Sequence, residues 1–256
     1  MQKFNNFFNF KNKIVLLTGS SGQLGKSFVD LFLAQKSKVI GIDIKKNNLK
    51  KKNFFYYRLD ITNKNEVDNF FTNIQKKFKR IDVIINNAGF STFSHFNNRK
   101  EHELDKTIDV NIKGALNIIN SYSKVHLKKK LKKCSIINIS SIYGVVSPDF
   151  RIYGKGDNFN SEIYGATKAA LIQITKYYSV ILAKSNININ CISPGGILNK
   201  SKPQNKKFVK KYSLRVPKNR MGRPSDLFTA LMFLSSEDSE YVNGQNIIVD
   251  GGLTLW

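Results

Sequence analysis

The sequence has few cysteines, few prolines and no long apolar run. Its two cysteines, Cys134 and Cys191, are too few for a disulfide framework, and both fall in strand-like segments, so we interpret them as buried thiols. Five prolines, no Ser/Gly-rich tract and no repeat leave nothing to divide the 256 residues, which favours one domain. No apolar run approaches the roughly 18 residues of a membrane span. We therefore expect a cytoplasmic protein without a membrane segment.

The N-terminus and the charge exclude less than they first suggest. Residues 1–10 are aromatic but interrupted by asparagine, unlike a signal peptide, so we expect a surface tail ahead of a domain at 11–256. The net charge of +24 is nearly all lysine, densest at 46–52 and 128–133, and comes with 29 asparagines. This looks like a compositional bias spread over the surface. Nucleic acid is therefore an unlikely partner, because no aromatic and arginine platform accompanies the lysines.

The first segment has the pattern of a dinucleotide site. Residues 13–18 form an apolar run typical of a buried parallel strand, followed by a glycine turn from Gly19 to Gly25 and an amphipathic helix at 26–36. Glycines in such a turn let the backbone approach a pyrophosphate, and the helix N-terminus favours its charge. A second strand at 38–43 ends in Asp43, whose carboxylate suits the ribose hydroxyls of NAD and disfavours the 2′-phosphate of NADP. The nearby Lys45 and Lys46 weaken this preference.

The remaining pattern repeats strand and helix. We predict strands at 54–60, 81–85, 135–141, 186–192 and 246–250, and helices at 65–79, 99–126, around Tyr164 and at 225–235. The fold class is therefore α/β, a Rossmann-type doubly wound parallel sheet of seven strands with helices on both faces. Asp60 and the small residues Asn87 to Gly89 stand at strand ends, where open α/β sheets bind ligands.

Tyr164 and Lys168 are the candidate reactive pair. A tyrosine and a lysine four apart on a helix share one face, so the ammonium can stabilise the phenolate and the pair can exchange protons. With 10 Tyr and 35 Lys, about one such spacing is expected by chance, so the pair needs its context. A mid-helix asparagine such as Asn111 usually points to solvent, and if it faces the site it can hold a water. The three histidines lack metal-ligand spacing, so we expect no metal.

Together these residues resemble the short-chain dehydrogenase/reductase family across about residues 10 to 253. The resemblance rests on a series in order along the chain: Thr18-Gly19…Gly25, Asp43, Asp60, Asn86-Asn-Ala-Gly89, Asn111, Ser141, Tyr164…Lys168, Pro194-Gly195 and Asn243-Gly-Gln…Val249-Asp-Gly-Gly252.

The resemblance implies an oxidoreductase. Ser141 would hydrogen-bond the substrate oxygen, Tyr164 would transfer its proton, Lys168 would lower the phenol pKa and bind the nicotinamide ribose, and Asn111 would position a water. NAD would be held by Gly19, Ser21, Gln23, Leu24, Gly25, Asp43, Asp60, Ile61, Asn87, Ala88, Gly89, Tyr164, Lys168, Pro194, Gly195 and Ile197. Family members usually pair through two long helices and the last strand, which implies a homodimer or homotetramer.

The sequence departs from the family pattern in three places. Gln23 stands where glycine is commoner, and Asn199 stands where a threonine often bonds the carboxamide. Ser141 and Tyr164 are 23 residues apart, more than is usual, and the insertion at 146–160 offers Arg151, Tyr153 and Asp157 to a hydroxylated or anionic substrate. The segment at about 198–222 is basic, lacks strong apolar periodicity and is interpreted as a mobile lid over the site.

Three functions follow as hypotheses. The insertion and the C-terminal pattern are similar to reductases of flagellin and surface-glycan (legionaminic-acid type) pathways and to gluconate dehydrogenases, which predicts a sugar, sugar phosphate or sugar acid as substrate. The first alternative is 3-oxoacyl-(acyl-carrier-protein) reduction, with the basic lid holding the acidic carrier. The second is a non-catalytic cofactor-sensing or nucleic-acid-binding module, which is disfavoured because all four candidate catalytic residues are present.

Overall fold

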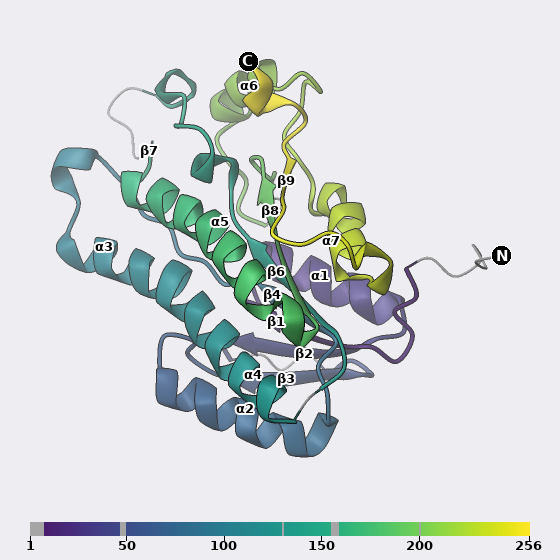
Figure 1. The fold of residues 1–256 in the computed structure, drawn as a ribbon. Coiled ribbons are helices and arrows are strands. Elements are labelled where there is room, and N and C mark those ends of the chain that lie inside the picture. Colours follow the sequence, from purple (N-terminus) through teal and green to yellow (C-terminus); the bar gives the residue numbers. More distant parts are fainter. Residues whose placement is uncertain (1–7, 47–49, 130, 155–158, 200) are drawn as a thin grey trace.

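A parallel sheet of seven strands forms the centre of the computed structural model, which describes residues 8–46, 50–129, 131–154, 159–199 and 201–256 (Figure 1). The strand order is β3-β2-β1-β4-β6-β8-β9, and every neighbouring pair is parallel. This confirms the predicted doubly wound fold. The strands are β1 (Ile14–Thr18), β2 (Lys38–Asp43), β3 (Phe54–Arg58), β4 (Val83–Asn86), β6 (Cys134–Ile139), β8 (Ile187–Pro194) and β9 (Asn246–Val249).

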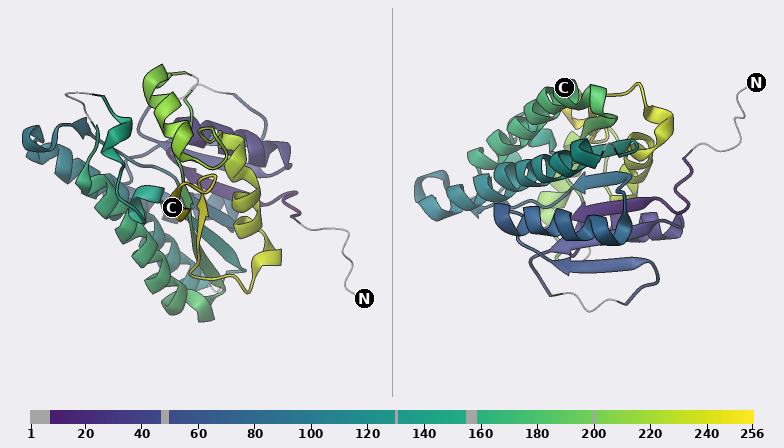
Figure 2. Two further views of the ribbon diagram at one scale, coloured as in Figure 1. Left: turned by 90° about the horizontal axis from the view of Figure 1, so that it is seen from above. Right: turned by 60° about the horizontal axis from the view of Figure 1, so that its bottom comes forward.

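Helices cover both faces of this sheet, because the central strands are apolar on both sides (Figure 1, Figure 2). The helices are α1 (Gln23–Ala34), α2 (Lys64–Phe78), α3 (Glu101–Ile108), α4 (Ala115–Lys129), α5 (Glu162–Leu182), α6 (Lys206–Arg215) and α7 (Phe228–Ser235). All five residues of β1 are buried, and neighbouring residues of the strand face opposite sides of the sheet. Leu16 belongs to a core cluster with residues of α2, α4 and α5, whereas Leu17 belongs to a cluster with residues of α1 and α7.

Two predicted boundaries differ from the structure: those of the helix at 99–126 and the end of the N-terminal tail. The helix predicted at 99–126 is a helical run from 101 to 129, and a wider π-helical turn, η3 (Asp109–Gly114), joins α3 to α4. The expected surface tail at 1–10 includes Phe10, which is only 2% exposed and packs edge-on against Phe32 with ring centroids 5.4 Å apart. The apolar core therefore includes Phe10, one residue before the predicted start of the domain, because this ring packs on the last turn of α1.

Two small elements near the sheet's C-terminal edge were not predicted. A two-stranded antiparallel sheet pairs β5 (Phe93–Ser94) with β7 (Phe159–Asn160), so the insertion is tied to the chain that follows β4. The supposed mobile lid contains α6, whose Tyr212 is 3% exposed and packs with Ile152 of the insertion in a third apolar cluster. The lid prediction missed this helix because its apolar face packs on the insertion, a contact between segments far apart in sequence.

We expect Leu16→Ala to lower the free energy of unfolding by about 2–5 kcal/mol, because it leaves a cavity in the central strand. Urea unfolding followed by circular dichroism measures this change. Leu214→Ala, at a residue 70% exposed on α6, is the control and should shift stability by no more than about 0.5 kcal/mol. Equal stability of the two variants would contradict the assignment of Leu16 to the core.

Candidate active site

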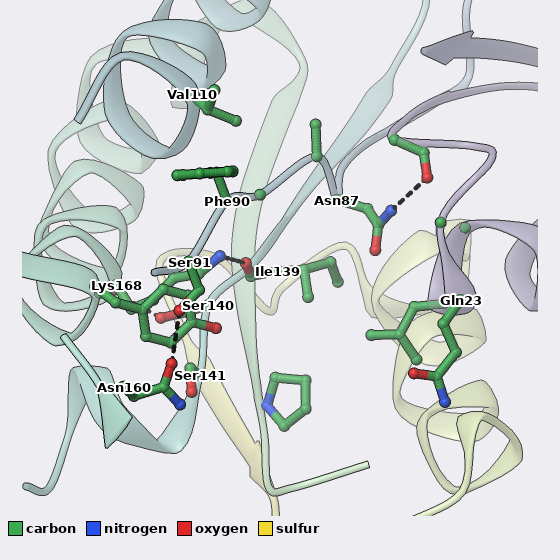
Figure 3. Close-up of a pocket in the computed structure, with 18 of the residues that line it drawn as sticks. Gln23, Asn87, Phe90, Ser91, Val110, Ile139, Ser140, Ser141, Asn160 and Lys168 are labelled. Carbon is green, nitrogen blue, oxygen red and sulfur yellow. Dashed lines mark hydrogen bonds between the residues drawn. The ribbon is translucent and has the colours of Figure 1, made fainter. Parts of the chain in front are cut away.

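A cavity of about 1150 Å³ opens at the C-terminal ends of the strands, where the winding of the sheet reverses between β1 and β4. Open α/β sheets bind ligands at such a reversal. The glycine turn and the ends of β2 and β3 line one end of the cavity. The start of α5, the insertion and α6 line the other. Figure 3 shows part of this lining, with Gln23 on one side and Ser141 and Lys168 on the other.

The ends of β1 and β4 are held together by side-chain hydrogen bonds. The Thr18 hydroxyl accepts from the backbone N–H groups of Asn87 (3.1 Å) and Ala88 (3.0 Å). In return, Asn87 Nδ2 donates to the carbonyls of Thr18 (3.0 Å) and Gly19 (3.2 Å). Gly19 has φ +66°, and a Cβ there would come within 2.8 Å of the Ala88 Cα, so a side chain is excluded on both grounds.

The glycine turn leaves its backbone open to the cavity. At Gly25 a Cβ would lie 2.0 Å from the Gly19 carbonyl oxygen, so the close approach of turn and helix requires glycine. The N-terminus of α1 begins at Gln23, and Gln23, Leu24 and Gly25 line the cavity. Gln23 Nε2 donates to the Leu198 carbonyl at 2.7 Å. The residue that departs from the family's usual glycine thus ties the turn to the segment before α6.

The carboxylate at the end of β2 is oriented by backbone N–H groups. Asp43 Oδ2 accepts from Ser21 N at 2.9 Å, and Oδ1 accepts from Lys45 N at 3.0 Å. Asp43, Lys45, Asp60 and Ile61 line the cavity. Ser21 is not part of the lining, and its backbone holds Asp43 in place instead.

Ser141 and Tyr164 meet despite the 23 residues between them. Ser141 stands two residues after the end of β6 and caps the 3₁₀ turn η4 (Ile142–Gly144). Its hydroxyl accepts from Tyr143 N at 3.2 Å. A hydrogen bond from Ser141 lowers the pKa of the Tyr164 phenol, but burial raises it more, so the net pKa lies above its ordinary value of 10.0. We expected Lys168 to lower this pKa, but in the protein alone the net shift is upward, and its causes are burial and the hydrogen bond from Ser141.

Lys168 is buried, with 4% of its surface exposed. Its ammonium donates to the Ile139 carbonyl at 2.8 Å, as Figure 3 shows, and lies 5.6 Å from the centre of the Tyr164 ring. Burial lowers the pKa of Lys168 to about 8. The Lys168 backbone carbonyl accepts from the Ser140 hydroxyl at 2.7 Å, which fixes α5 against the end of β6.

A mid-helix asparagine usually points to solvent, but Asn111 points into the protein. It lies in the π-helical turn and is 1% exposed. Its Nδ2 donates to the Phe90 carbonyl and to Thr167 Oγ1, both at 2.9 Å, and its Oδ1 accepts from Phe90 N at 2.8 Å. A Cβ on Gly89 would lie 3.5 Å from both Asn111 Oδ1 and Lys168 Nζ. Asn111 therefore stands behind the cavity wall, close to the lysine.

Some of the other predicted residues line the cavity, some lie elsewhere, and one falls outside the described residues. Asn87, Ala88, Gly89, Pro194, Gly195, Ile197 and Tyr153 line the cavity. Asn199, expected to bond a carboxamide, instead accepts from the backbone N–H groups of Ser201 and Lys202, both at 3.0 Å, and is not in the lining. Arg151 is paired with Asp149 and its side chain is 84% exposed, so it points away. Asp157 lies outside the described residues.

Several lining residues were missed by the sequence analysis: Ser91, Tyr143, Asn160, Gln204, Phe208 and Tyr212. Asn160 could have been found, because it stands four residues before Tyr164. Ser91 and Tyr143 could have been found as well, because each follows a motif residue, Gly89 or Ser141, by two positions. Gln204, Phe208 and Tyr212 come from a segment without any motif, which the packing of α6 on the insertion places beside the cavity.

Comparison with known proteins decides the family. A family model described as enoyl-(acyl carrier protein) reductase matches residues 23–254. A 3-oxoacyl-(acyl-carrier-protein) reductase of Thermotoga maritima is 32% identical over 96% of this chain and 99% of its own. The chain belongs to the short-chain dehydrogenase/reductase family. As a member of that family it is an oxidoreductase.

Other short-chain dehydrogenases share its length and fold. A structure from Leptospira borgpetersenii, solved with bound NAD+, superposes with a TM-score of 0.91 at 37% identity, covering 99% of this chain and 98% of that one. An NAD-dependent glycerol dehydrogenase of Listeria innocua is 26% identical over 98% of both chains. Over the described part of this dehydrogenase/reductase, no helix is long and apolar enough to cross a membrane.

The buried lysine should make stability depend on pH. Lys168 has a pKa of about 8 in the folded protein against an ordinary value of 10.5, so between these values the unfolded chain binds more protons. The penalty for burying the ammonium is therefore full below pH 8 and disappears as the pH rises to about 10.5. We expect the free energy of unfolding of the wild type to rise across this range relative to Lys168→Met, measured by urea unfolding.

Lys176→Met, an exposed lysine of α5, is the matched control and should give a constant difference from the wild type. Parallel stability curves for the wild type and Lys168→Met between pH 7.5 and 10.5 would contradict the lowered pKa.

Proposed function

We propose that the protein is an NAD(H)-dependent oxidoreductase that transfers a hydride between the nicotinamide and a secondary alcohol or ketone of a sugar, sugar phosphate or sugar acid. The observation that carries the proposal is the convergence of Ser141, Tyr164 and Lys168 on one cavity whose other end is the glycine turn and Asp43. Proton-transfer groups and a dinucleotide cradle in one cavity are what hydride transfer to a carbonyl requires.

The chain's residues fit NAD. The absence of a Cβ at Gly19 and Gly25 keeps the turn tight, and the backbone N–H groups at the α1 N-terminus, which has no side-chain cap, could receive a pyrophosphate. Asp43 is aimed into the cavity by its bonds to Ser21 N and Lys45 N, and its carboxylate can accept from ribose hydroxyls. The Leptospira relative, with NAD+ bound, supports the same cofactor here.

The residues also fit roles in proton transfer. Ser141 would donate to the substrate oxygen, and Tyr164 would accept the alcohol proton during oxidation or return it during reduction. Lys168 would stabilise the phenolate and hold the nicotinamide ribose, and Asn111 would position a water that leads to Lys168. When bound, NAD+ supplies the hydride acceptor and a positive ring charge. That charge favours the Tyr164 phenolate, whose pKa the protein alone leaves raised.

A second candidate is reduction of a 3-oxoacyl thioester on a carrier protein. Two observations favour it. The first is the similarity of the chain to the 3-oxoacyl-(acyl-carrier-protein) reductase of Thermotoga maritima. The second is the presence of four lysines on α6, which could hold an acidic partner: Lys206, Lys207, Lys210 and Lys211. Asp43 disfavours it, because that biosynthetic reduction generally uses NADPH. Activity on acetoacetyl thioesters with NADPH, exceeding that on every sugar with NADH, would support the carrier-protein reaction.

We also propose a cytoplasmic homodimer or homotetramer. The exposed face of α5 carries Tyr177, Val180 and Ile181, which are 59%, 78% and 55% exposed in the single chain. Apolar side chains gathered on one helix commonly mark an interface between subunits.

Tyr164→Phe should reduce kcat/KM by about 10²–10⁴-fold with any accepted substrate, because it removes the proton donor and keeps the ring. The rate is measured by NADH absorbance, and NADH binding by fluorescence should weaken by no more than about 10-fold, because at most one hydrogen bond to the cofactor is lost. Tyr241→Phe, at a fully exposed tyrosine, is the control and should keep the wild-type rate. Near wild-type turnover by Tyr164→Phe would rule out its role in proton transfer.

Asp43→Ser should raise the ratio of kcat/KM with NADP+ to that with NAD+ by at least about 10-fold, because it removes the charge that repels a 2′-phosphate and leaves Lys45 beside it. Steady-state rates with both cofactors give the ratio. Asp30→Asn, an exposed carboxylate of α1, should leave the ratio as it is. An Asp43→Ser ratio equal to that of the wild type would place the ribose elsewhere.

A further inference from the structure

Asn160 is held in a fixed position beside the candidate reactive pair. It pairs with Phe93 in the β5·β7 sheet and precedes Ser161, the buried residue that caps α5 by accepting from Tyr164 N at 3.2 Å. The neighbouring Phe159 is covered by the Arg99 guanidinium, 5.9 Å from the ring centre. Arg99 is itself paired with Glu162 at 2.7 Å and is 3% exposed. Both sides of Asn160 are therefore anchored.

The Asn160 amide is oriented by Ser91. The Ser91 hydroxyl donates to Asn160 Oδ1 at 2.6 Å, which turns the amide nitrogen the other way. Figure 3 shows this nitrogen directed away from Ser91, on the side where Ser141 lies, and all three residues line the cavity. Among the described residues no acceptor is found for Asn160 Nδ2. An oriented donor without an acceptor at a cavity wall is suited to a ligand oxygen.

The surrounding wall is neutral and aromatic. The Tyr143 and Tyr153 hydroxyls lie 3.4 Å apart, and the Tyr153 ring packs on Phe208 of α6 with centroids 5.4 Å apart. Tyrosine rings and hydroxyls can contact both the C–H and the O–H groups of a sugar. The only described cation on this wall is Lys168, which already donates to the Ile139 carbonyl.

The remaining described charges in the lining come from other elements. Asp43, Lys45 and Asp60 follow β2 and β3, whereas Lys106 on α3 lies over the Phe90 ring, 4.7 Å from its centre, among Asp105 and Asp109. Among the described lining residues, a phosphate or carboxylate placed against Asn160 would therefore lack a free cationic partner. Burying such a charge without a partner is unfavourable.

We propose that Asn160, oriented by Ser91, is a substrate-binding residue that donates a hydrogen bond from Nδ2 to a hydroxyl of an uncharged, polyhydroxylated substrate. This rests on the proposed function and narrows its substrate class from sugars, sugar phosphates and sugar acids to the neutral compounds. Asn160 contacts the substrate without transferring a proton, so its loss should act mainly on substrate binding.

The test is steady-state kinetics with NAD+ or NADH on hexoses, hexitols and ketohexoses, and on the matching hexose phosphates and hexonates. We expect the wild type to have its highest kcat/KM on a neutral member. Asn160→Ala should raise KM for that compound about 10-fold, with kcat changed less than about 3-fold, because it removes one hydrogen bond. Ser91→Ala should raise KM in the same direction by a smaller factor, because the amide stays but loses its orientation.

The control is Asn98→Ala, at an exposed asparagine of the 3₁₀ turn that follows β5, which should match the wild type in every constant. Melting temperatures of the variants show whether the fold is kept, and KM for NAD+ should be unchanged in all of them. An unchanged substrate KM in Asn160→Ala, or a wild type that prefers a phosphate or an acid by more than about 10-fold, would overturn this inference alone. Absence of hydride transfer by the wild type to every compound would overturn the proposed function as well.

Discussion

The rest of the site depends on the hydrogen bonds that Thr18 and Asn87 form between the ends of β1 and β4. One hydroxyl, that of Thr18, receives two backbone N–H groups from the neighbouring strand end, and Asn87 returns two bonds to the glycine turn. The two strands are adjacent, but 64 residues of chain lie between Thr18 and Val83. Parallel strands end at the same edge of a sheet, so these hydrogen bonds set the position of the glycine turn relative to the other strand ends.

At the other end of the cavity, burial shifts the pKa values of the two candidate proton-transfer residues. Lys168 is held as a donor to the Ile139 carbonyl in a place where burial lowers its pKa to about 8, and the Tyr164 pKa is raised for the same reason. Both groups are thus displaced toward their neutral forms, so the protein alone favours the neutral phenol, and the positive ring charge of bound NAD+ would be needed to favour the phenolate. Asn111 and Ser140, each bonded to backbone or to a neighbouring hydroxyl, keep this pair in place.

The insertion gives the cavity its third wall. It is fixed on one side by the β5·β7 pairing and on the other by packing on α6, where Lys211 also donates to the Arg151 carbonyl at 3.0 Å. These contacts join the insertion to α6, and the polar groups Asn160 and Tyr153 that line the cavity come from residues 146–160. Differences in substrate among relatives with the same reactive residues are expected in such a segment.

The sequence by itself determined the seven strands, the glycine turn, Asp43 and the Tyr164/Lys168 spacing, because these follow from apolar runs, backbone requirements and helical periodicity, all of which are local. Only the tertiary structure decided where side chains point and which distant segments meet. The π-helical turn directs Asn111 inward, Gln23 reaches Leu198, and Ser91 orients Asn160. Tyr212 packs α6, a helix within the expected lid, on the insertion. Each of these depends on a contact between segments far apart in the chain, which no local pattern encodes.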